Sequence, residues 1–411
     1  MISALAEGAL SGASTAGARA LDDAVTSYLA SRADTPVILK RALATDPEHL
    51  MARCLMGYLT RLAGDPANAA RARALHEALR RQVDSGAASA WERAHVQALG
   101  LWLDDHLHAL MAHFEALLDQ HPTDILALRM LHYLYFYDGD AGRMRDSVAA
   151  RLNAFAGHPA EGYVKGMLAF GLEEAGDYAQ AEHYGREAVA VEPQDIWAAH
   201  AVAHVMEMQG RSADGIAWIR ELRPGWQAAN NFRFHLDWHE ALFHLSEHDL
   251  DAALALYDHD VAPAVDDDFY LDLCNAASLL LRLEAHGCDV GERWLPLARV
   301  AEHHCRDTEL VFASLHYLMP LLKTDHPAAG ALLAELELWA RRDTTQGHVV
   351  RDVARHVAAF LAALHEADHA AAAGHFETFR HDLHRIGGSH AQRELFHILD
   401  RQTPENNGHG I

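Results

Sequence analysis

The sequence predicts an all-α fold built from helix hairpins. Glycine and proline are sparse, and they separate long segments that are rich in alanine and leucine. No segment shows the sustained alternation of apolar and polar residues that a half-buried strand requires. With 411 residues, of which 50% are hydrophobic and 22% charged, the chain is long enough to bury a large core.

The clearest hairpin runs from Tyr163 to Pro193. Ala169 is a small residue in its first helix, Gly176 and Asp177 form its turn, and Pro193 marks its exit. These features match the tetratricopeptide pattern of about 34 residues, in which small residues let two helices approach and glycine makes the turn. We therefore predict a tetratricopeptide-type α-solenoid.

Three further hairpins support this prediction. One begins near Ile125 and turns around Gly139, and another begins at Ile196 and turns at Gly210. The third is "HLDWHEALFHLSEHDLDAALALYD" (residues 235–258), in which His248-Asp249 replaces the usual Gly-Asp. The clearest repeats thus cover residues 125–260.

The rest of the chain fits the same architecture less regularly. The segment 67–96 has the pattern of an inserted extra helix, and the repeat pattern decays after about Val261. We expect one solenoid domain over residues 1–400 that closes on itself as a superhelix. Residues 401–411 are predicted to be a disordered tail.

Charge and cysteine content exclude several classes of partner. The formal charge of −24 argues against nucleic acid or an anionic membrane as the main partner, because both need a basic surface. The four cysteines include no C-x-x-C pair, the N-terminus lacks a basic start, and no apolar run approaches membrane-spanning length. A cytoplasmic protein is expected.

The stretch "WAAHAVAHVMEMQG", which starts at Trp197, places polar groups on one helical stripe. His200, His204 and Glu207 are separated by four and three residues, so their side chains return almost to the same azimuth. In the repeat register these positions face the inner groove together with Trp197. They either satisfy one another and neighbouring carbonyl groups, or they bind a ligand.

The stretch "FHLDWHEALFHLSEHD" adds a second pair of imidazoles. His235 and His239 are four residues apart, whereas His244 and His248 lie on the other side of the helix and are expected at the surface or between helices. If adjacent repeats converge, His200, His204, His235 and His239 form a ligand set that suits zinc, iron or manganese. No H-E-x-x-H signature accompanies them.

The same register places side chains of the two preceding repeats toward the groove. They are Arg129, Tyr133, Phe136, Tyr137, Tyr163, Phe170, Glu173 and Glu174. The groove is therefore expected to be aromatic at one end and rich in imidazoles further on.

Several stretches resemble the tetratricopeptide repeat protein 38 family. They include "YFYDGDAGRMRDSVAARL", "GYVKGMLAFGLEEAGDYAQAEHYGREAVAVEPQDIWAAHAVAHVMEMQGR", "HLDWHEALFHL", "SLLLRLEAHGCDVGERW" and "IGGSHAQRE". The resemblance implies a fold more than a function. It marks as family positions His200, His204, Glu207, His235, Trp238, His239, Ser278, Arg282, His316 and the Gly387-Gly388-Ser389 turn. Asn275 stands where the family pattern leads us to expect an acidic residue, and His390 where relatives can have asparagine.

The stretch "IGGSHAQRE" also has a structural interpretation. Ser389 and Gln392 form the S-x-x-Q capping box of a new helix, which leaves His390 and Arg393 as candidate pocket residues. Asn275, Ser278 and Arg282 recur at three- to four-residue steps and predict a polar seam on one helix. Arg282 would suit an anionic group of a substrate.

Two classes of function follow. In the first, the protein binds a small molecule or a peptide segment against Tyr133, Tyr137, Trp197, Trp238 and the imidazoles, without chemistry. In the second, the protein is an enzyme: histidines 200, 204, 235 and 239 hold a metal or transfer protons, Glu207 acts as base or orienting carboxylate, and Arg282 or Arg393 fixes an anionic group. His390 is a further candidate for catalysis. No phosphate loop or G-x-S-x-G element occurs. We favour the binding class, and the sequence makes no prediction of the oligomeric state.

Overall fold

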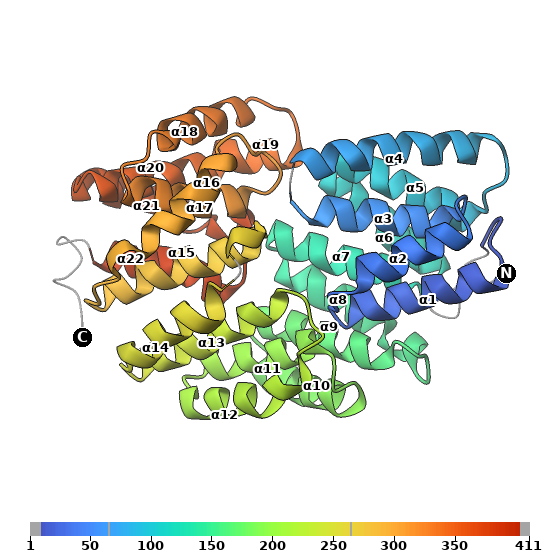
Figure 1. Cartoon of the computed structure of the whole chain (residues 1–411), viewed down its shortest axis with the longest axis horizontal. Helices are drawn as coiled ribbons and strands as arrows, with labels where there is room; N and C mark the ends of the chain where they lie inside the picture. Colours follow the sequence, from blue (N-terminus) through green and yellow to red (C-terminus); the bar gives the residue numbers. More distant parts are fainter. Residues whose placement is uncertain (1–9, 65, 264, 403–411) are drawn as a thin grey trace. The chain divides into compact units, whose positions relative to one another are not determined.

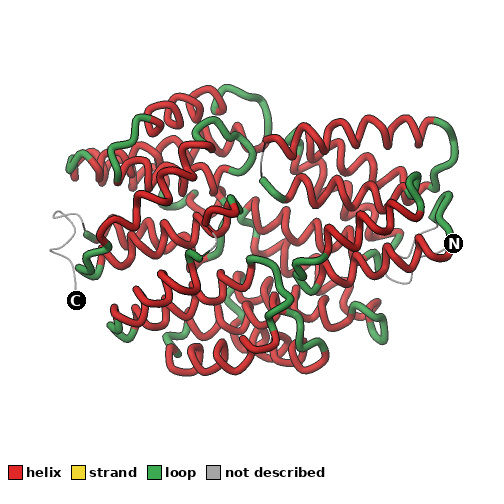
Figure 2. Tube along the Cα trace, in the orientation of Figure 1, coloured by secondary structure: helices red, strands yellow, loops and turns green. Residues whose placement is uncertain are grey.

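The computed structural model describes residues 10–64, 66–263 and 265–402. These residues form helices joined by short turns and loops (Figure 2). Within them no strand occurs, and an isolated antiparallel bridge joins Arg32 to Ala229. The predicted all-α class is confirmed.

The chain divides into two compact units. Unit 1 comprises Met1–Tyr135, Ala141–Val205 and Leu222–Phe232. Unit 2 comprises Phe136–Asp140, Met206–Glu221 and Arg233–Ile411. The expected single solenoid domain over residues 1–400 stays a prediction.

The helices that lie wholly or mostly in unit 1 are α1 (Thr15–Leu29), α2 (Thr35–Thr45), α3 (Leu50–Leu62), α4 (Pro66–Asp84), α5 (Ala90–Leu103), α6 (Leu107–Gln120), α7 (Ile125–Asp138), α8 (Ala141–Arg151), η1 (Leu152–Phe155), α9 (Glu161–Glu174), α10 (Tyr178–Val191), α11 (Ile196–Met208) and η2 (Arg223–Gly225). Those of unit 2 are α12 (Ser212–Leu222), α13 (Phe232–Ser246), α14 (Leu250–Leu256), η3 (Tyr257–Val261), η4 (Val265–Asp267), α15 (Tyr270–Ala285), η5 (Gly291–Arg293), α16 (Trp294–His303), α17 (Val311–Lys323), α18 (Ala328–Trp339), α19 (Thr345–Val349), η6 (Val350–Ala354), α20 (Arg355–His365), α21 (His369–Phe379), η7 (Leu383–Ile386) and α22 (His390–Arg401).

Neighbouring helices pack in pairs within each unit. In unit 1, α9 packs against α10 and α3 against α4, and in unit 2, α20 packs against α21 (Figure 1). Small residues permit the close approach of α10 to its two neighbours: a Cβ atom at Gly185 of α10 would lie 3.5 Å from Cβ of Ala169 on α9 and 2.5 Å from Cγ2 of Val202 on α11. The prediction that small residues let adjacent helices come together is therefore confirmed at this position.

The predicted turns are present. Gly139, Gly176 and Gly210 have φ values of 73°, 85° and 66°, in the left-handed region where glycine has no Cβ to clash. His248 adopts the same region with φ 58°, and Asp249 then caps α14. These positions each end one helix and precede the next.

The side chain of Asp124 determines where α7 starts. Oδ1 of Asp124 accepts from the backbone N–H of Ala127 at the first turn of α7. Its Oδ2 accepts from Nε1 of Trp91 at 2.6 Å and pairs with Nε2 of His95 at 2.8 Å. The cap therefore also ties α7 to α5, with no carboxylate oxygen left unused.

The segments outside the clearest repeats are helical as well. Helix α4 occupies most of the segment expected to hold an inserted helix, and α5 begins in its last part. The segment beyond Val261 continues as helices to Arg401, and residues 403–411 of the predicted tail lie outside the described residues. None of the described helices combines the length and the apolar character needed to cross a bilayer.

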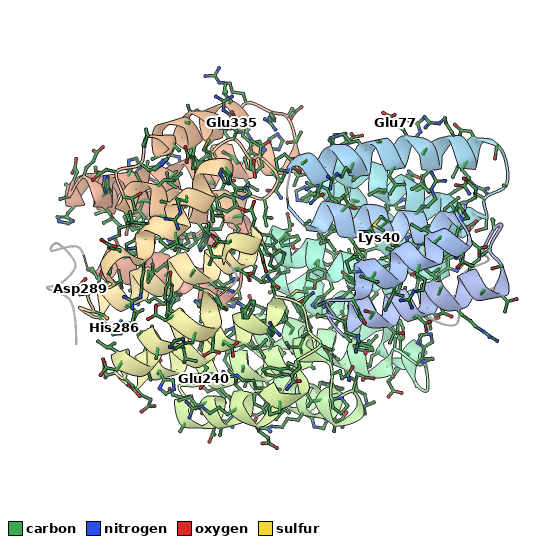
Figure 3. All side chains as sticks on the ribbon, viewed as in Figure 1. Lys40, Glu77, Glu240, His286, Asp289 and Glu335 are labelled. Carbon is green, nitrogen blue, oxygen red and sulfur yellow. The ribbon has the colours of Figure 1, made fainter. Side chains whose placement is uncertain are left out.

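Charged side chains cover the outer surface of both units. Lys40 on α2 and Glu77 on α4 are exposed, as is Asp289 in the loop after α15 (Figure 3). Some charged and polar residues are buried instead. Most of the buried polar residues on α7, α9, α11, α13 and α15 belong to the stripes predicted from the sequence.

Candidate functional site

Asp195 sets the start of α11 and so the direction of its histidines. Its Oδ1 accepts hydrogen bonds from the backbone N–H groups of Trp197 and Ala198, both at 3.1 Å. With this first turn held, positions 200 and 204 lie on one stripe with Trp197. His200 and His204 are buried, with 2% and 0% of their surface exposed.

Aromatic rings enclose His200 within unit 1. Its ring centroid lies 5.3 Å from that of Phe170 and 5.1 Å from that of Phe232. Trp197 contacts Phe170 at 4.9 Å and stacks on Phe232 at 5.3 Å. This lining keeps the local dielectric low, which strengthens any electrostatic interaction of the neighbouring polar groups.

Two consecutive glutamates of α9 complete the polar group of unit 1. Glu173 and Glu174 are buried, and Oε2 of Glu173 lies 3.4 Å from Nδ1 of His204. One oxygen of each carboxylate and one nitrogen of His204 lie within 4.8 Å of one another. We call Glu173, Glu174 and His204 the Glu/His cluster. The ring of His200 is 4.3 Å from that of His204, so a second imidazole borders the cluster.

The Glu/His cluster has the donor chemistry of a transition-metal site. Carboxylate oxygens and imidazole nitrogens are ligands of zinc, iron(II) and manganese(II). The repeat register placed both glutamates on the groove side, but sequence reasoning did not join them to His204. Their separation of 31 residues, about one repeat, is the signal that could have done so.

Tyr133 of α7 lies on the same aromatic lining. Its ring centroid is 5.3 Å from that of Trp197, and its hydroxyl accepts a hydrogen bond from Arg129 at 3.1 Å. Arg129 was placed toward the groove by the repeat register, and it belongs to this site. His132, which the sequence analysis did not single out, lies 5.8 Å from Trp197 and 6.0 Å from Phe170 between ring centroids.

In unit 2, Glu207 and His239 form a close carboxylate–imidazole pair. Nδ1 of His239 lies 2.6 Å from Oε2 of Glu207, and the His239 ring is buried while Glu207 is partly exposed. A carboxylate at this distance orients the imidazole and selects its tautomer. This is the arrangement by which an imidazole acts as a general base.

His235 precedes His239 by one turn of α13 and has a neutral partner. Its Nδ1 lies 2.9 Å from Oδ1 of Asn275 on α15. Its ring stacks on Trp238 at 5.1 Å and lies 4.8 Å from the ring of His239. An acidic residue at position 275 would have given His235 a carboxylate partner, whereas Asn275 gives it a neutral amide.

The predicted polar seam on α15 is buried and internally bonded. Arg282 donates to the hydroxyl of Ser278 and, at 2.5 Å, to the carbonyl of Ala391. Its guanidinium lies 5.4 Å from the Trp238 ring centroid. Burial lowers the pKa of Arg282 to about 10, with Glu207 opposing the shift. Through its hydrogen bond to the carbonyl of Ala391, Arg282 ties α15 to α22.

The remaining candidates of unit 2 have structural partners. Nδ1 of His316 lies 2.8 Å from the carbonyl of Phe312, and burial lowers its pKa to about 4, so its ring is neutral. Arg393 donates to the carbonyl of Gly388, whose close approach to Phe312 excludes a side chain at that position. The Ser389–Gln392 capping box is present as predicted.

His390 is exposed on the first turn of α22. The hydroxyl of Tyr137 lies 3.3 Å from that of Tyr270. His244 is buried beside Arg220, at 3.2 Å, and His248 is exposed, so this pair does lie apart from His235 and His239.

Unit 1 thus brings together Trp197, His200, His204 and Tyr133 with the two glutamates of α9. Unit 2 brings together Glu207, His235, Trp238, His239, Asn275, Ser278 and Arg282. The convergence of all four histidines on one ion stays a prediction. No protein-family model matches the chain.

Proposed function

We propose that this chain is a tetratricopeptide-type solenoid protein that binds a small molecule inside unit 1, through a metal ion held by the Glu/His cluster. Successive left-handed turns at positions 139, 176, 210 and 248 are 34 to 38 residues apart, which supports the repeat type. The resemblance to the tetratricopeptide repeat protein 38 family is consistent with it. The burial of the cluster favours a small ligand over a peptide segment.

The main support for this proposal is the burial of two adjacent carboxylates beside an imidazole. Glu173 and Glu174 are 1% and 6% exposed, and their oxygens lie within 4.8 Å of a nitrogen of His204. Like charges at this distance in a low dielectric destabilise each other, and a divalent cation offsets both at once. The three side chains would hold zinc, iron or manganese, and His200 borders them as a further donor.

A metal-assisted enzyme is the second candidate. The Glu207–His239 distance of 2.6 Å favours it, because this pair has the geometry of a general base. In that case His239 would accept a proton and Glu207 would stabilise the resulting imidazolium. Activity would then depend on both residues of the pair, whereas simple binding by unit 1 would depend on neither.

We also propose a cytoplasmic setting. Cys54, Cys274, Cys288 and Cys305 are all free thiols. Burial raises the pKa of the Cys54 thiol to about 12, so this side chain is an inert member of the core. Free thiols suit a reducing compartment.

The metal content of the purified protein tests the proposal. We expect about one zinc, iron or manganese ion per chain by elemental analysis, or stoichiometric uptake of Zn²⁺ or Mn²⁺ by chelator-stripped protein in calorimetry. His204→Gln should weaken uptake at least tenfold, because it removes a ligand. Glu173→Gln should do the same.

His183→Gln is the matched control, because His183 is an exposed histidine of unit 1 on α10. It should bind metal as the wild type does. Wild-type protein that carries no metal, takes up none and has the same unfolding midpoint in chelator would rule out the metal site. Equal uptake by His204→Gln would place the ion elsewhere.

A further inference from the structure

Arg129 is a buried cation in unit 1, held by aromatic rings. It is 2% exposed, and its guanidinium carbon lies 4.4 Å from the ring centroid of Trp197 and 4.7 Å from that of Tyr133. Nη2 donates to the Tyr133 hydroxyl at 3.1 Å. Cation–π contacts of this kind stabilise a charge partly, but they do not replace a counter-ion.

No carboxylate oxygen lies within ion-pair distance of Arg129 among the described residues, but the buried carboxylate of Asp195 is near enough to interact with its charge. The Nε–H of Arg129 has no hydrogen-bond acceptor there. Burial lowers the pKa of Arg129, but Tyr133, Tyr28 and Asp195 together outweigh this effect and raise the pKa above its ordinary value. The guanidinium is therefore charged. A buried charge with one neutral hydrogen-bond partner is costly, and an anion that enters beside it would recover that cost.

Two other buried side chains near Arg129 have unused hydrogen-bonding groups. Nε1 of Trp197 has no acceptor among the described residues, and neither ring nitrogen of His132 has a partner there. Burial lowers the pKa of His132 well below its ordinary value, so its ring is neutral and offers one N–H donor. Arg129 and His132 on α7 and Trp197 on α11 thus each have an unused N–H donor among the described residues.

We propose that Arg129, His132 and Trp197 form a subsite for the oxyanion group of a small ligand, with a carboxylate as the primary candidate. The half-buried rings of Tyr133 and Phe232 border it and would pack against the apolar part of that ligand. The inference deepens the proposed function by naming the ligand class, and only its link to the metal ion rests on that function. The shared aromatic lining of Trp197 and Phe170 connects this subsite to the Glu/His cluster.

Arg151 provides a matched comparison in the same unit. It is also buried, at 7% exposed, but it donates to Glu115 at 2.8 Å and to Asp119 at 3.2 Å. Its charge is compensated by the protein itself. Arg151→Met should therefore lower stability and leave anion binding intact, whereas Arg129→Met should weaken anion binding at least tenfold.

The test uses the full chain in chelator, with benzoate, inorganic phosphate and the neutral benzyl alcohol as probes. Tryptophan fluorescence and the thermal midpoint report binding. We expect benzoate to bind and to raise the midpoint of the wild type, and benzyl alcohol to bind at least tenfold more weakly. Arg129→Met should weaken benzoate binding at least tenfold, and Arg129→Lys should retain part of it, since the charge remains but the planar fork is lost.

Binding of phosphate in place of benzoate, with the same loss in Arg129→Met, supports the oxyanion subsite and assigns it to phosphate. The inference is wrong if neither anion binds the wild type, or if Arg129→Met binds as well as the wild type. Because chelator is present throughout, benzoate binding by protein that takes up no metal would reject the metal ion and keep the subsite.

Discussion

Asp195→Asn should change the pH dependence of stability in a way that the structure specifies. Asp195 caps α11 through Oδ1, while its Oδ2 has no hydrogen-bond partner among the described residues. Burial raises its pKa to about 7, against the lowering effect of Arg129. Asparagine can keep the capping bonds with its carbonyl oxygen but has no charge to bury.

The magnitude follows from proton linkage. An acid whose native pKa is raised from 3.8 to about 7 holds its proton longer in the folded state. Its contribution to stability therefore falls as pH rises from about 4 to 7, by ~1.4 kcal/mol per pH unit. The resulting penalty is about 2 kcal/mol at pH 5 and about 4 kcal/mol at pH 8. The stability of Asp195→Asn relative to the wild type should rise by about 2 to 3 kcal/mol between these pH values.

Urea unfolding at pH 5 and pH 8 measures this difference, and any constant cost of the amide cancels from it. Asp124→Asn is the control, since both oxygens of Asp124 accept hydrogen bonds. It should lose stability at both pH values, because an amide nitrogen cannot accept from Trp91. An equal effect of Asp195→Asn at pH 5 and pH 8 would refute the reasoning.

Two further predictions concern other parts of the units. The ring nitrogens of His304 lie 2.5 Å from Asp307 and from Asp268; burial lowers its pKa, but these carboxylates outweigh it and raise the pKa to about 9. The stabilisation of the folded state by His304 is complete below pH 6.5 and is lost as pH rises through 9. His304→Gln should therefore lower the free energy of unfolding by about 2 kcal/mol at pH 6, allowing for partial exposure, and by much less at pH 10. An equal cost at both pH values would contradict this prediction. Gly185→Val places its Cβ against Val202 and should cost about 1 to 3 kcal/mol in urea unfolding, whereas an unchanged midpoint would show that α10 and α11 do not pack as described.

Helices and turns were predictable because their signals are local. Gly176-Asp177 and His248-Asp249 mark turns in the sequence, and the backbone at Gly176 and His248 is left-handed. The capping box is visible in the four-residue motif from Ser389 to Gln392. The placement of His200 and His204 on one stripe of α11 follows from the helical period alone, and both residues are buried.

The partners of each polar side chain were not predictable in this way. Asp124 and Asp195 are 71 residues apart and both cap a helix, so the sequence treats them alike. His95 and Gly166 are also 71 residues apart: His95 bonds to Asp124, whereas the space beside Oδ2 of Asp195 is where a Cβ of Gly166 would fall, at 2.5 Å. The same capping signal therefore gives a fully hydrogen-bonded carboxylate at Asp124 and a carboxylate with a raised pKa at Asp195.

The sequence by itself determined the helical class, the turn positions and the faces that are buried, because period and capping act over a few residues. Only the tertiary structure decided that Glu173 lies beside His204 and that Arg129 has aromatic neighbours in place of a carboxylate. Those facts depend on which side chains meet across adjacent helices. A pattern within one helix does not contain that information, because the free energy of a buried charge is set by its neighbours in space.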